Sequence, residues 1–82
     1  MDTKYIVFDL PLQGYVAIIF PPCISHRDMA MKMGIDYVDN AGFVKLDDKR
    51  NATLYGRSSS LNVDSNPAFN DMVTRMFKSE WE

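Results

Sequence analysis

Residues 56–60 (GRSSS) bring together the side chains of this chain that are best suited to bind another molecule. A glycine, an arginine and three hydroxyl groups can hold a phosphate or a carboxylate through backbone N–H groups and a guanidinium fork. No P-loop lysine follows, and no glycine-rich loop leads into a helix, so a nucleotide-binding loop is not indicated. The alternative is that the serines form the polar face of an edge strand and that Arg57 is a solvated or ion-paired surface residue.

Cys23 and His26 form a second pair with reactive side chains, because they stand three positions apart beside a predicted helix start, where a thiolate is favoured. As a nucleophile and its base they lack an orienting third group and an oxyanion arrangement. One cysteine and one histidine also fall short of a structural zinc set. We therefore expect a small buried thiol and a histidine at the helix start, with no catalytic residues, metal or cofactor. A Cys23-dependent enzyme is the least favoured hypothesis.

Length and charge exclude several classes of protein. The 82 residues predict one small domain over residues 1–82, and nine basic and eleven acidic residues give a net charge of −2. Dispersed charges of this kind disfavour direct nucleic-acid binding, which normally uses a clustered basic surface. A single cysteine indicates a reducing compartment. Residues 1–4 do not form a basic leader, and the apolar run 15–20 is too short to span a bilayer, so we expect a cytoplasmic protein without membrane contact.

The first half of the chain predicts two strands and a short helix. Residues 4–10 and 15–20 are rich in branched and aromatic side chains, and Pro11 and Gly14 break the chain between them. Because the run 15–20 is almost continuously apolar, we place it in the centre of the sheet. Ser25 then provides an N-cap for a short helix, and Gly34 stands where a left-handed C-cap belongs.

The second half predicts a hairpin and a longer helix. Residues 43–46 and 52–56 are strand-like runs on either side of a charged loop, and the second run is expected to continue through residues 58–61. Asn66 and Pro67 provide an N-cap and a first helical position. An apolar stripe at helical spacing follows, formed by Phe69, Met72, Val73, Met76 and Phe77. The order ββαββα predicts an α+β fold, a four-stranded antiparallel sheet with both helices on one face.

Five side chains are the predicted contact residues for a binding partner: Tyr55, Arg57, Ser58, Ser60 and Trp81. Arginine and aromatic residues often dominate the energetics of protein interfaces. Trp81 lies beyond the last apolar position of the helix, where it either docks back on the sheet or anchors a partner. An exposed sheet edge in this region also offers pairing with a partner's strand or with itself in a homodimer.

The string AGFVKL, followed by ATLYGRSSSLNVDS, a proline and a helix, resembles a segment of small uncharacterised proteins of phages and prophages. The resemblance covers residues 41–77 and includes no catalytic signature. Small phage proteins of this kind are often accessory factors, and some inhibit host enzymes or defence systems, as anti-CRISPR proteins do. By analogy, the resemblance implies a non-enzymatic inhibitor that binds a host protein or nucleoprotein complex in the host cytosol.

A second hypothesis from the residues themselves is a binding module for a phosphorylated ligand or single-stranded nucleic acid. In that case Arg57 supplies the charge, and Tyr55 or Tyr37 supplies a stacking surface.

Overall fold

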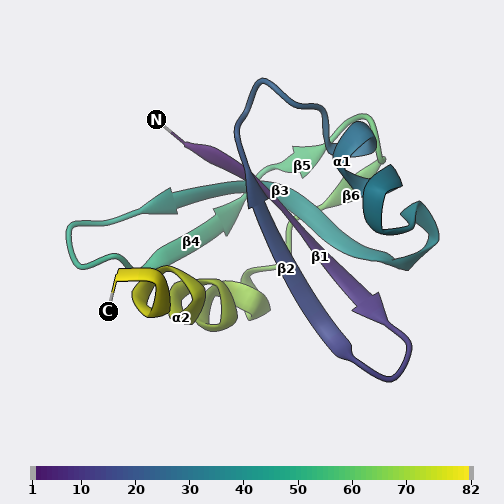
Figure 1. Ribbon diagram of the computed structural model, residues 1–82. Helices are drawn as coiled ribbons and strands as arrows, with labels where there is room; N and C mark the ends of the chain where they lie inside the picture. Colours follow the sequence, from purple (N-terminus) through teal and green to yellow (C-terminus); the bar gives the residue numbers. More distant parts are fainter. Residues whose placement is uncertain (1, 82) are drawn as a thin grey trace.

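The computed structural model describes the backbone of residues 2–81 and the side chains of residues 2–78, and it has an α+β fold (Figure 1). Its elements in chain order are β1 (Thr3–Leu10), β2 (Gly14–Phe20), α1 (His26–Met33), the 3-10 turn η1 (Ile35–Tyr37), β3 (Val38–Leu46), β4 (Ala52–Tyr55), β5 (Arg57–Ser58), β6 (Val63–Asp64), the 3-10 turn η2 (Pro67–Phe69) and α2 (Asn70–Trp81). No helix within residues 2–81 is long and apolar enough to cross a membrane.

The main sheet confirms the predicted four antiparallel strands and shows the order β2-β1-β3-β4. The prediction that residues 15–20 form a central strand is wrong, because β2 is an edge strand and β1 lies in the interior of the sheet. Residues 5–8 of β1 are all buried, whereas most of β2 is partly or fully exposed. An apolar run of this length suits either position, so it could not identify the central strand.

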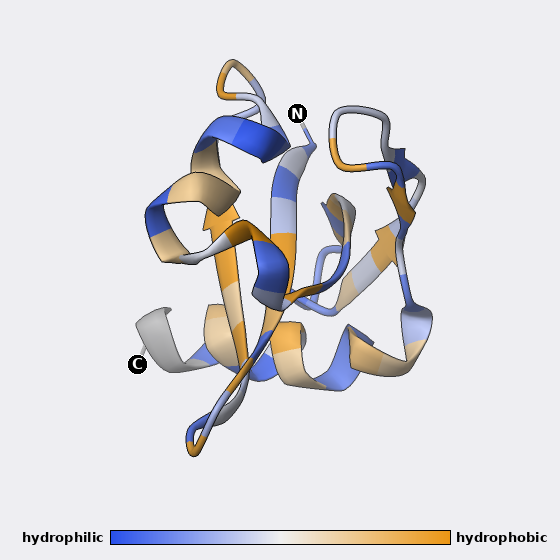
Figure 2. Ribbon diagram, turned by 90° about the vertical axis from the view of Figure 1, so that its right-hand side faces the viewer, coloured by the Kyte–Doolittle hydropathy of each residue, from blue (hydrophilic) through white to orange (hydrophobic). Residues whose placement is uncertain are grey.

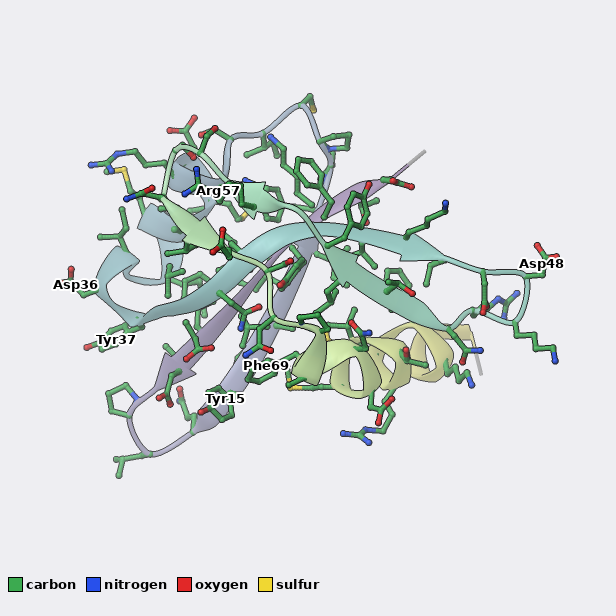
Figure 3. All side chains as sticks on the ribbon, turned by 180° about the vertical axis from the view of Figure 1, so that it is seen from behind. Tyr15, Asp36, Tyr37, Asp48, Arg57 and Phe69 are labelled. Atoms are coloured by element: carbon green, nitrogen blue, oxygen red, sulfur yellow. The ribbon has the colours of Figure 1, made fainter. Side chains whose placement is uncertain are left out.

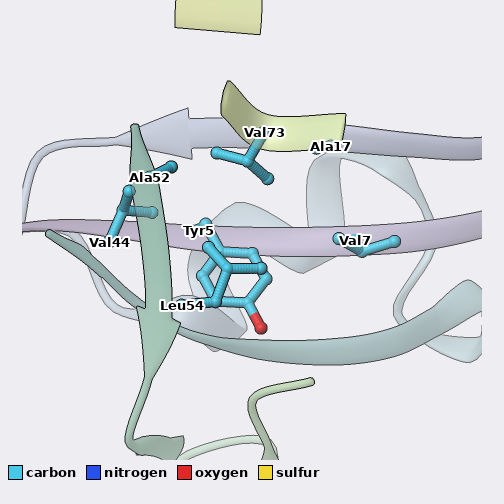
Figure 4. Packing of buried hydrophobic residues seen from close by; sticks show 7 residues of the cluster. All are labelled: Tyr5, Val7, Ala17, Val44, Ala52, Leu54 and Val73. Carbon is cyan, nitrogen blue, oxygen red and sulfur yellow. The ribbon is translucent and has the colours of Figure 1, made fainter. Parts of the chain in front are cut away.

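The two helices cover opposite faces of the sheet, which corrects the prediction that both lie on one face. Tyr5 and Val7 of β1 pack in a cluster with Val73 of α2 (Figure 4). Ile6 and Phe8, which alternate with them, belong to a second cluster on the side of α1. Because successive strand residues point to opposite faces, four consecutive apolar residues on β1 require cover on both sides. Figure 2 shows the hydrophobic stretches of the strands lying between the two helices.

The predicted helix caps are confirmed at both helices. The side-chain oxygen of Ser25 accepts a hydrogen bond from the N–H of Asp28 at 3.0 Å. Gly34 ends α1 with a φ of 113°, a conformation that favours glycine. The side-chain oxygen of Asn66 accepts from the N–H of Ala68 at 3.0 Å, so the 3-10 turn before α2 starts from the predicted cap.

The chain after Tyr55 differs from the prediction, because β4 does not continue through residues 58–61. Gly56 has a φ of 75° and turns the chain out of the main sheet. Residues 57–58 then pair with residues 63–64 in a separate two-stranded sheet. The left-handed conformation of Asn62, with a φ of 57°, closes this small β5–β6 hairpin, and asparagine tolerates that conformation better than most residues.

The backbone approaches itself closely at Gly42 in the middle of β3. A Cβ atom at this position would stand 2.5 Å from the backbone oxygen of Tyr55 and 3.0 Å from Cβ of Ser65. The end of β4 and the segment after β6 therefore lie directly against β3 here. This contact positions the β5–β6 hairpin relative to the main sheet.

Candidate functional site

The predicted contact residues converge only in part, on a surface formed by the end of β4 and the β5–β6 hairpin. We call the exposed residues Tyr55, Arg57, Ser60, Asn62 and Asp64 the Arg57 surface. Figure 3 shows Arg57 on this hairpin.

Arg57 is held in a defined position by two partners from the opposite side of the hairpin. Its Nε lies 3.2 Å from Oδ1 of Asp64, and a terminal guanidinium nitrogen donates to Oδ1 of Asn62 at 2.7 Å. The ion pair is solvated, since 52% of the Arg57 side chain and 83% of the Asp64 side chain are exposed. Such a pair contributes little to stability, but it orients the guanidinium group before a partner arrives.

Tyr55 is the aromatic member of the Arg57 surface. Its ring lies tilted on Phe43 with 5.8 Å between the ring centroids, and 38% of the residue remains exposed. Its hydroxyl group donates a hydrogen bond to the carboxylate of Asp2, which raises the pKa of Tyr55 above its ordinary value. The ring therefore presents one partly exposed face beside a carboxylate.

The two predicted serines have different roles. Ser58 is fully buried, and its hydroxyl oxygen accepts a hydrogen bond from the N–H of Leu61 at 3.2 Å. Its prediction as a contact residue is therefore corrected: Ser58 closes the turn inside the hairpin. Ser60 is exposed, and its hydroxyl oxygen accepts from the N–H of Arg27 at 3.2 Å, which links the hairpin to the first turn of α1. The side chain of Trp81, the fifth predicted residue, lies outside the described residues.

The partners of Arg57 were not foreseen from the sequence. Asn62 and Asp64 stand in a stretch whose composition predicts only a turn. The β5–β6 register places Arg57 directly across from Asp64. No local pattern indicates a two-residue strand pair, so the sequence contains no signal that Asn62 and Asp64 are the partners of Arg57.

The Cys23 and His26 pair is separated by the fold. Cys23 is exposed, contrary to the expected buried thiol, whereas His26 is buried at the start of α1. The Nε2 atom of His26 lies 2.8 Å from the carbonyl oxygen of Gly42, and because a carbonyl oxygen only accepts, Nε2 carries the proton. The His26 ring also packs edge-on against Phe20 and Phe43, with centroid distances of 5.5 and 5.7 Å. His26 therefore fastens α1 to β3.

No candidate metal site lies within the part of the chain that the structure describes, since no three histidine, cysteine, aspartate or glutamate side chains there are grouped to hold an ion.

The burial of His26 predicts a loss of stability in mild acid. Burial lowers its pKa below the usual 6.5, and the positive charge of Lys4 acts in the same direction, although the hydrogen bond to Gly42 partly opposes them. The unfolded chain therefore binds a proton more readily. The stabilisation is complete above pH 6.5 and is lost as the pH falls through the lower pKa of the folded state.

Urea unfolding at pH 7.5 and pH 5.0 measures this effect, with His26→Gln as the control that cannot titrate. We expect the free energy of unfolding to fall more between the two pH values in the wild type than in His26→Gln. Equal losses in both proteins would show that other groups cause the acid sensitivity.

Comparison with protein-family models, with curated proteins and with solved structures found no match for this chain.

Proposed function

We propose that this chain is a non-enzymatic binding module that acts through protein–protein contact at the Arg57 surface. The observation that carries the proposal is the fixed guanidinium group of Arg57, which is oriented by Asp64 and Asn62 and remains half exposed. A side chain ordered before binding loses less conformational entropy in the complex. Arginine and tyrosine are also among the residue types that most often carry interface energy, and Tyr55 stands two positions before Arg57 in the chain.

The charges around this surface favour a protein partner over a phosphate or a nucleic acid. Asp64 lies against the Arg57 guanidinium group, and Asp2 accepts the hydrogen bond of the Tyr55 hydroxyl group. Both carboxylates repel an incoming anion. Asp64 also neutralises the positive charge of Arg57 that would otherwise attract the anion. A protein surface with its own donors and cations suits this mixture of charges better.

A narrower proposal concerns the biological role. The segment that resembles phage and prophage proteins, residues 41–77, contains the whole Arg57 surface. We propose that the partner is a host protein or nucleoprotein complex, which this chain inhibits in the host cytosol in the manner of an anti-CRISPR protein. The inhibitor role depends on the analogy between gene classes. The proposal that the Arg57 surface binds a protein does not depend on that analogy.

Replacing Arg57 with alanine tests the contact surface. We expect binding to weaken by about 1–2 kcal/mol, on the order of tenfold in Kd, because the ordered guanidinium group is lost. The measurement is retention of a partner from a lysate of the source organism, or of its bacterial host if the source is a phage, followed by titration of the purified partner. Arg75→Ala is the matched control, since Arg75 is an exposed arginine on α2.

Equal affinities of Arg57→Ala and Arg75→Ala would contradict the assignment of the Arg57 surface. The thermal stability of both variants must match that of the wild type, because a partly unfolded variant would also lose binding.

The alternative function, binding of a phosphorylated ligand or single-stranded nucleic acid, has its own test. Thermal stabilisation by nucleotides, or oligonucleotide binding that weakens steeply with salt and is lost in Arg57→Ala, would favour it over a protein partner.

A further inference from the structure

The two edges of the main sheet differ in how their backbone groups are satisfied. At the β4 edge, the N–H of Ala52 donates to the hydroxyl oxygen of Thr74 at 2.8 Å. The N–H of Leu54 donates to the side-chain oxygen of Asn70 at 2.9 Å. Both acceptors belong to α2, which lies beside β4 in Figure 1. The side chains of α2 thus cap this edge against another strand.

Because the N–H groups of Ala52 and Leu54 point outward to α2, they show to which side each residue of the sheet directs its backbone N–H and C=O groups. In an antiparallel sheet, successive residues direct their N–H and C=O groups to alternate sides. Leu54 directs its N–H outward, so Val44, its partner in the register, directs its groups toward β1. There Val44 pairs with Thr3, whose groups consequently point toward β3.

The same alternation identifies the groups on the outer side of β2. Lys4, which follows Thr3, directs its groups toward β2, where Phe20 is its partner. The outward residues of β2 are therefore Ile19, Ala17 and Tyr15. No hydrogen bond among the described residues reaches their outer side, because β2 pairs with β1 alone.

This open edge lacks the protective features with which proteins usually prevent strands from associating. The seven residues of β2 (GYVAIIF) include no charge and no proline, and their register with β1 is unbroken. Three branched side chains, Val16, Ile18 and Ile19, remain partly exposed. Natural edge strands are typically short, charged, bulged or covered. The chain covers β4 with α2 and leaves β2 ready for pairing.

We propose that β2 pairs in antiparallel fashion with β2 of a second copy of this chain, about a two-fold axis at Ala17. Ala17 then faces Ala17 of the second copy, and Tyr15 faces Ile19. Because the outward residues are symmetric about Ala17, each outward N–H and C=O group of the three residues has a partner. The two four-stranded sheets become one continuous sheet of eight strands.

The side chains of β2 suit pairing with an identical strand. The register sets Tyr15 across from Ile19 and Val16 across from Ile18, and aromatic–branched and branched–branched pairs are favourable across strands. With no charge on β2, the two-fold axis brings no like charges together there. In the adjoining strand, Asp9 lies opposite Tyr15 and Lys4 opposite Phe20. Antiparallel pairing therefore places Asp9 of one copy at the end that carries Lys4 of the other.

The first test is the mass of the purified protein in solution across a range of concentrations, measured by light scattering or sedimentation. We expect the wild type to be a dimer and Tyr15→Lys to be a monomer at the same concentrations, because lysine on an edge strand opposes pairing and each copy would bring its charge against Ile19 of the other. Met31→Lys is the matched control, since Met31 is an exposed apolar residue on α1, and it should remain dimeric.

Tyr15 packs edge-on against Phe69 with 4.9 Å between the ring centroids, and Figure 3 shows the two rings together. Because the substitution removes this contact, the fold of Tyr15→Lys is checked by circular dichroism. A wild type that stays monomeric up to about 1 mM, a weak-affinity limit, overturns the proposal. A folded Tyr15→Lys variant that remains a dimer overturns it as well. If the wild type is monomeric, the edge of β2 is available to a strand of a different protein.

The second test determines the register and does not require a disruptive substitution. In a Cys23→Ser background, Val16→Cys and Ile18→Cys are prepared as separate proteins. The register sets residue 16 of one copy across from residue 18 of the other in a non-hydrogen-bonded pair, where the Cα separation of about 4.5 Å permits a disulfide. We expect cross-linked dimers when the two variants are mixed and oxidised. Cross-linking of either variant alone, at the same extent, would contradict the two-fold axis at Ala17.

Discussion

Gly42→Ala is expected to lower the free energy of unfolding by about 2–3 kcal/mol, because it inserts a methyl group into closely packed backbone. The added Cβ would stand 2.5 Å from the carbonyl oxygen of Tyr55, a backbone atom that cannot rotate away. β3 and β4 must therefore separate locally. The same displacement would disturb the bond from His26 to the Gly42 carbonyl oxygen. Urea unfolding followed by far-UV circular dichroism measures the loss.

Gly14→Ala separates this steric effect from the general effect of replacing a glycine. Gly14 has a φ of 77°, and a Cβ there would meet no atom within 4 Å. Its replacement therefore has only a conformational cost, about 1 kcal/mol. Without a clash, alanine in the interior of a strand would be neutral or stabilising relative to glycine. A Gly42→Ala protein as stable as the wild type would thus disprove the close approach of β3 and β4.

Tyr5→Phe is expected to destabilise the fold by about 2–4 kcal/mol, because it leaves one buried and one partly buried polar group without a partner. The Tyr5 hydroxyl group donates to the side-chain oxygen of Asn40 at 2.5 Å and accepts from the N–H of Asn66 at 3.1 Å. Tyr5 is fully buried and Asn40 is nearly so. One hydroxyl group thus joins β1, β3 and the cap residue before α2.

Tyr37→Phe is the matched control for Tyr5→Phe. Tyr37 is 43% exposed, and removing its hydroxyl group should change the stability by less than about 0.5 kcal/mol. Similar losses in the two variants would refute a special role for the Tyr5 hydroxyl group.

The burial of the Tyr5 hydroxyl group also leads us to expect that the free energy of unfolding falls at high pH. Burial raises the pKa of Tyr5 from its ordinary value of 10.0 to about 12, although the hydrogen bond from Asn66 works against this shift. The folded state therefore keeps a proton that the unfolded chain releases. Below pH 10 the stabilisation is complete, and about 2–3 kcal/mol of it is lost as the pH rises from 10 to 12. The stability difference between wild type and Tyr5→Phe should narrow over this range, and a constant difference would contradict the shift.

Local signals in the sequence predicted the helices well. Ser25 and Asn66 act as caps, and Gly34 ends α1, because these effects depend on hydrogen bonds and backbone preferences within a few residues. The stripe from Phe69 to Phe77 turns toward the sheet as its helical spacing requires. The starts of β1, β2 and β4 were predicted to within one residue, whereas β3 begins at Val38, five residues before the predicted run 43–46, and the β5–β6 pair was not predicted.

The arrangement of these elements depended on contacts between distant residues. The pairing of β1 with β3 joins segments far apart in the chain, and it moves β1 into the interior of the sheet and β2 to its edge. The candidate site likewise required the β5–β6 register, which sets Asp64 across from Arg57 and buries Ser58.

The sequence by itself determined the two helices with their caps and the approximate positions of β1, β2 and β4. The tertiary structure decided the strand order, the placement of the helices on opposite faces, and the edge that remains open. The physical reason is that periodicity and capping depend on residues close together in the chain. An apolar strand, in contrast, can form its backbone hydrogen bonds with any neighbouring strand. Only long-range packing, including the capping of β4 by α2, selects that neighbour.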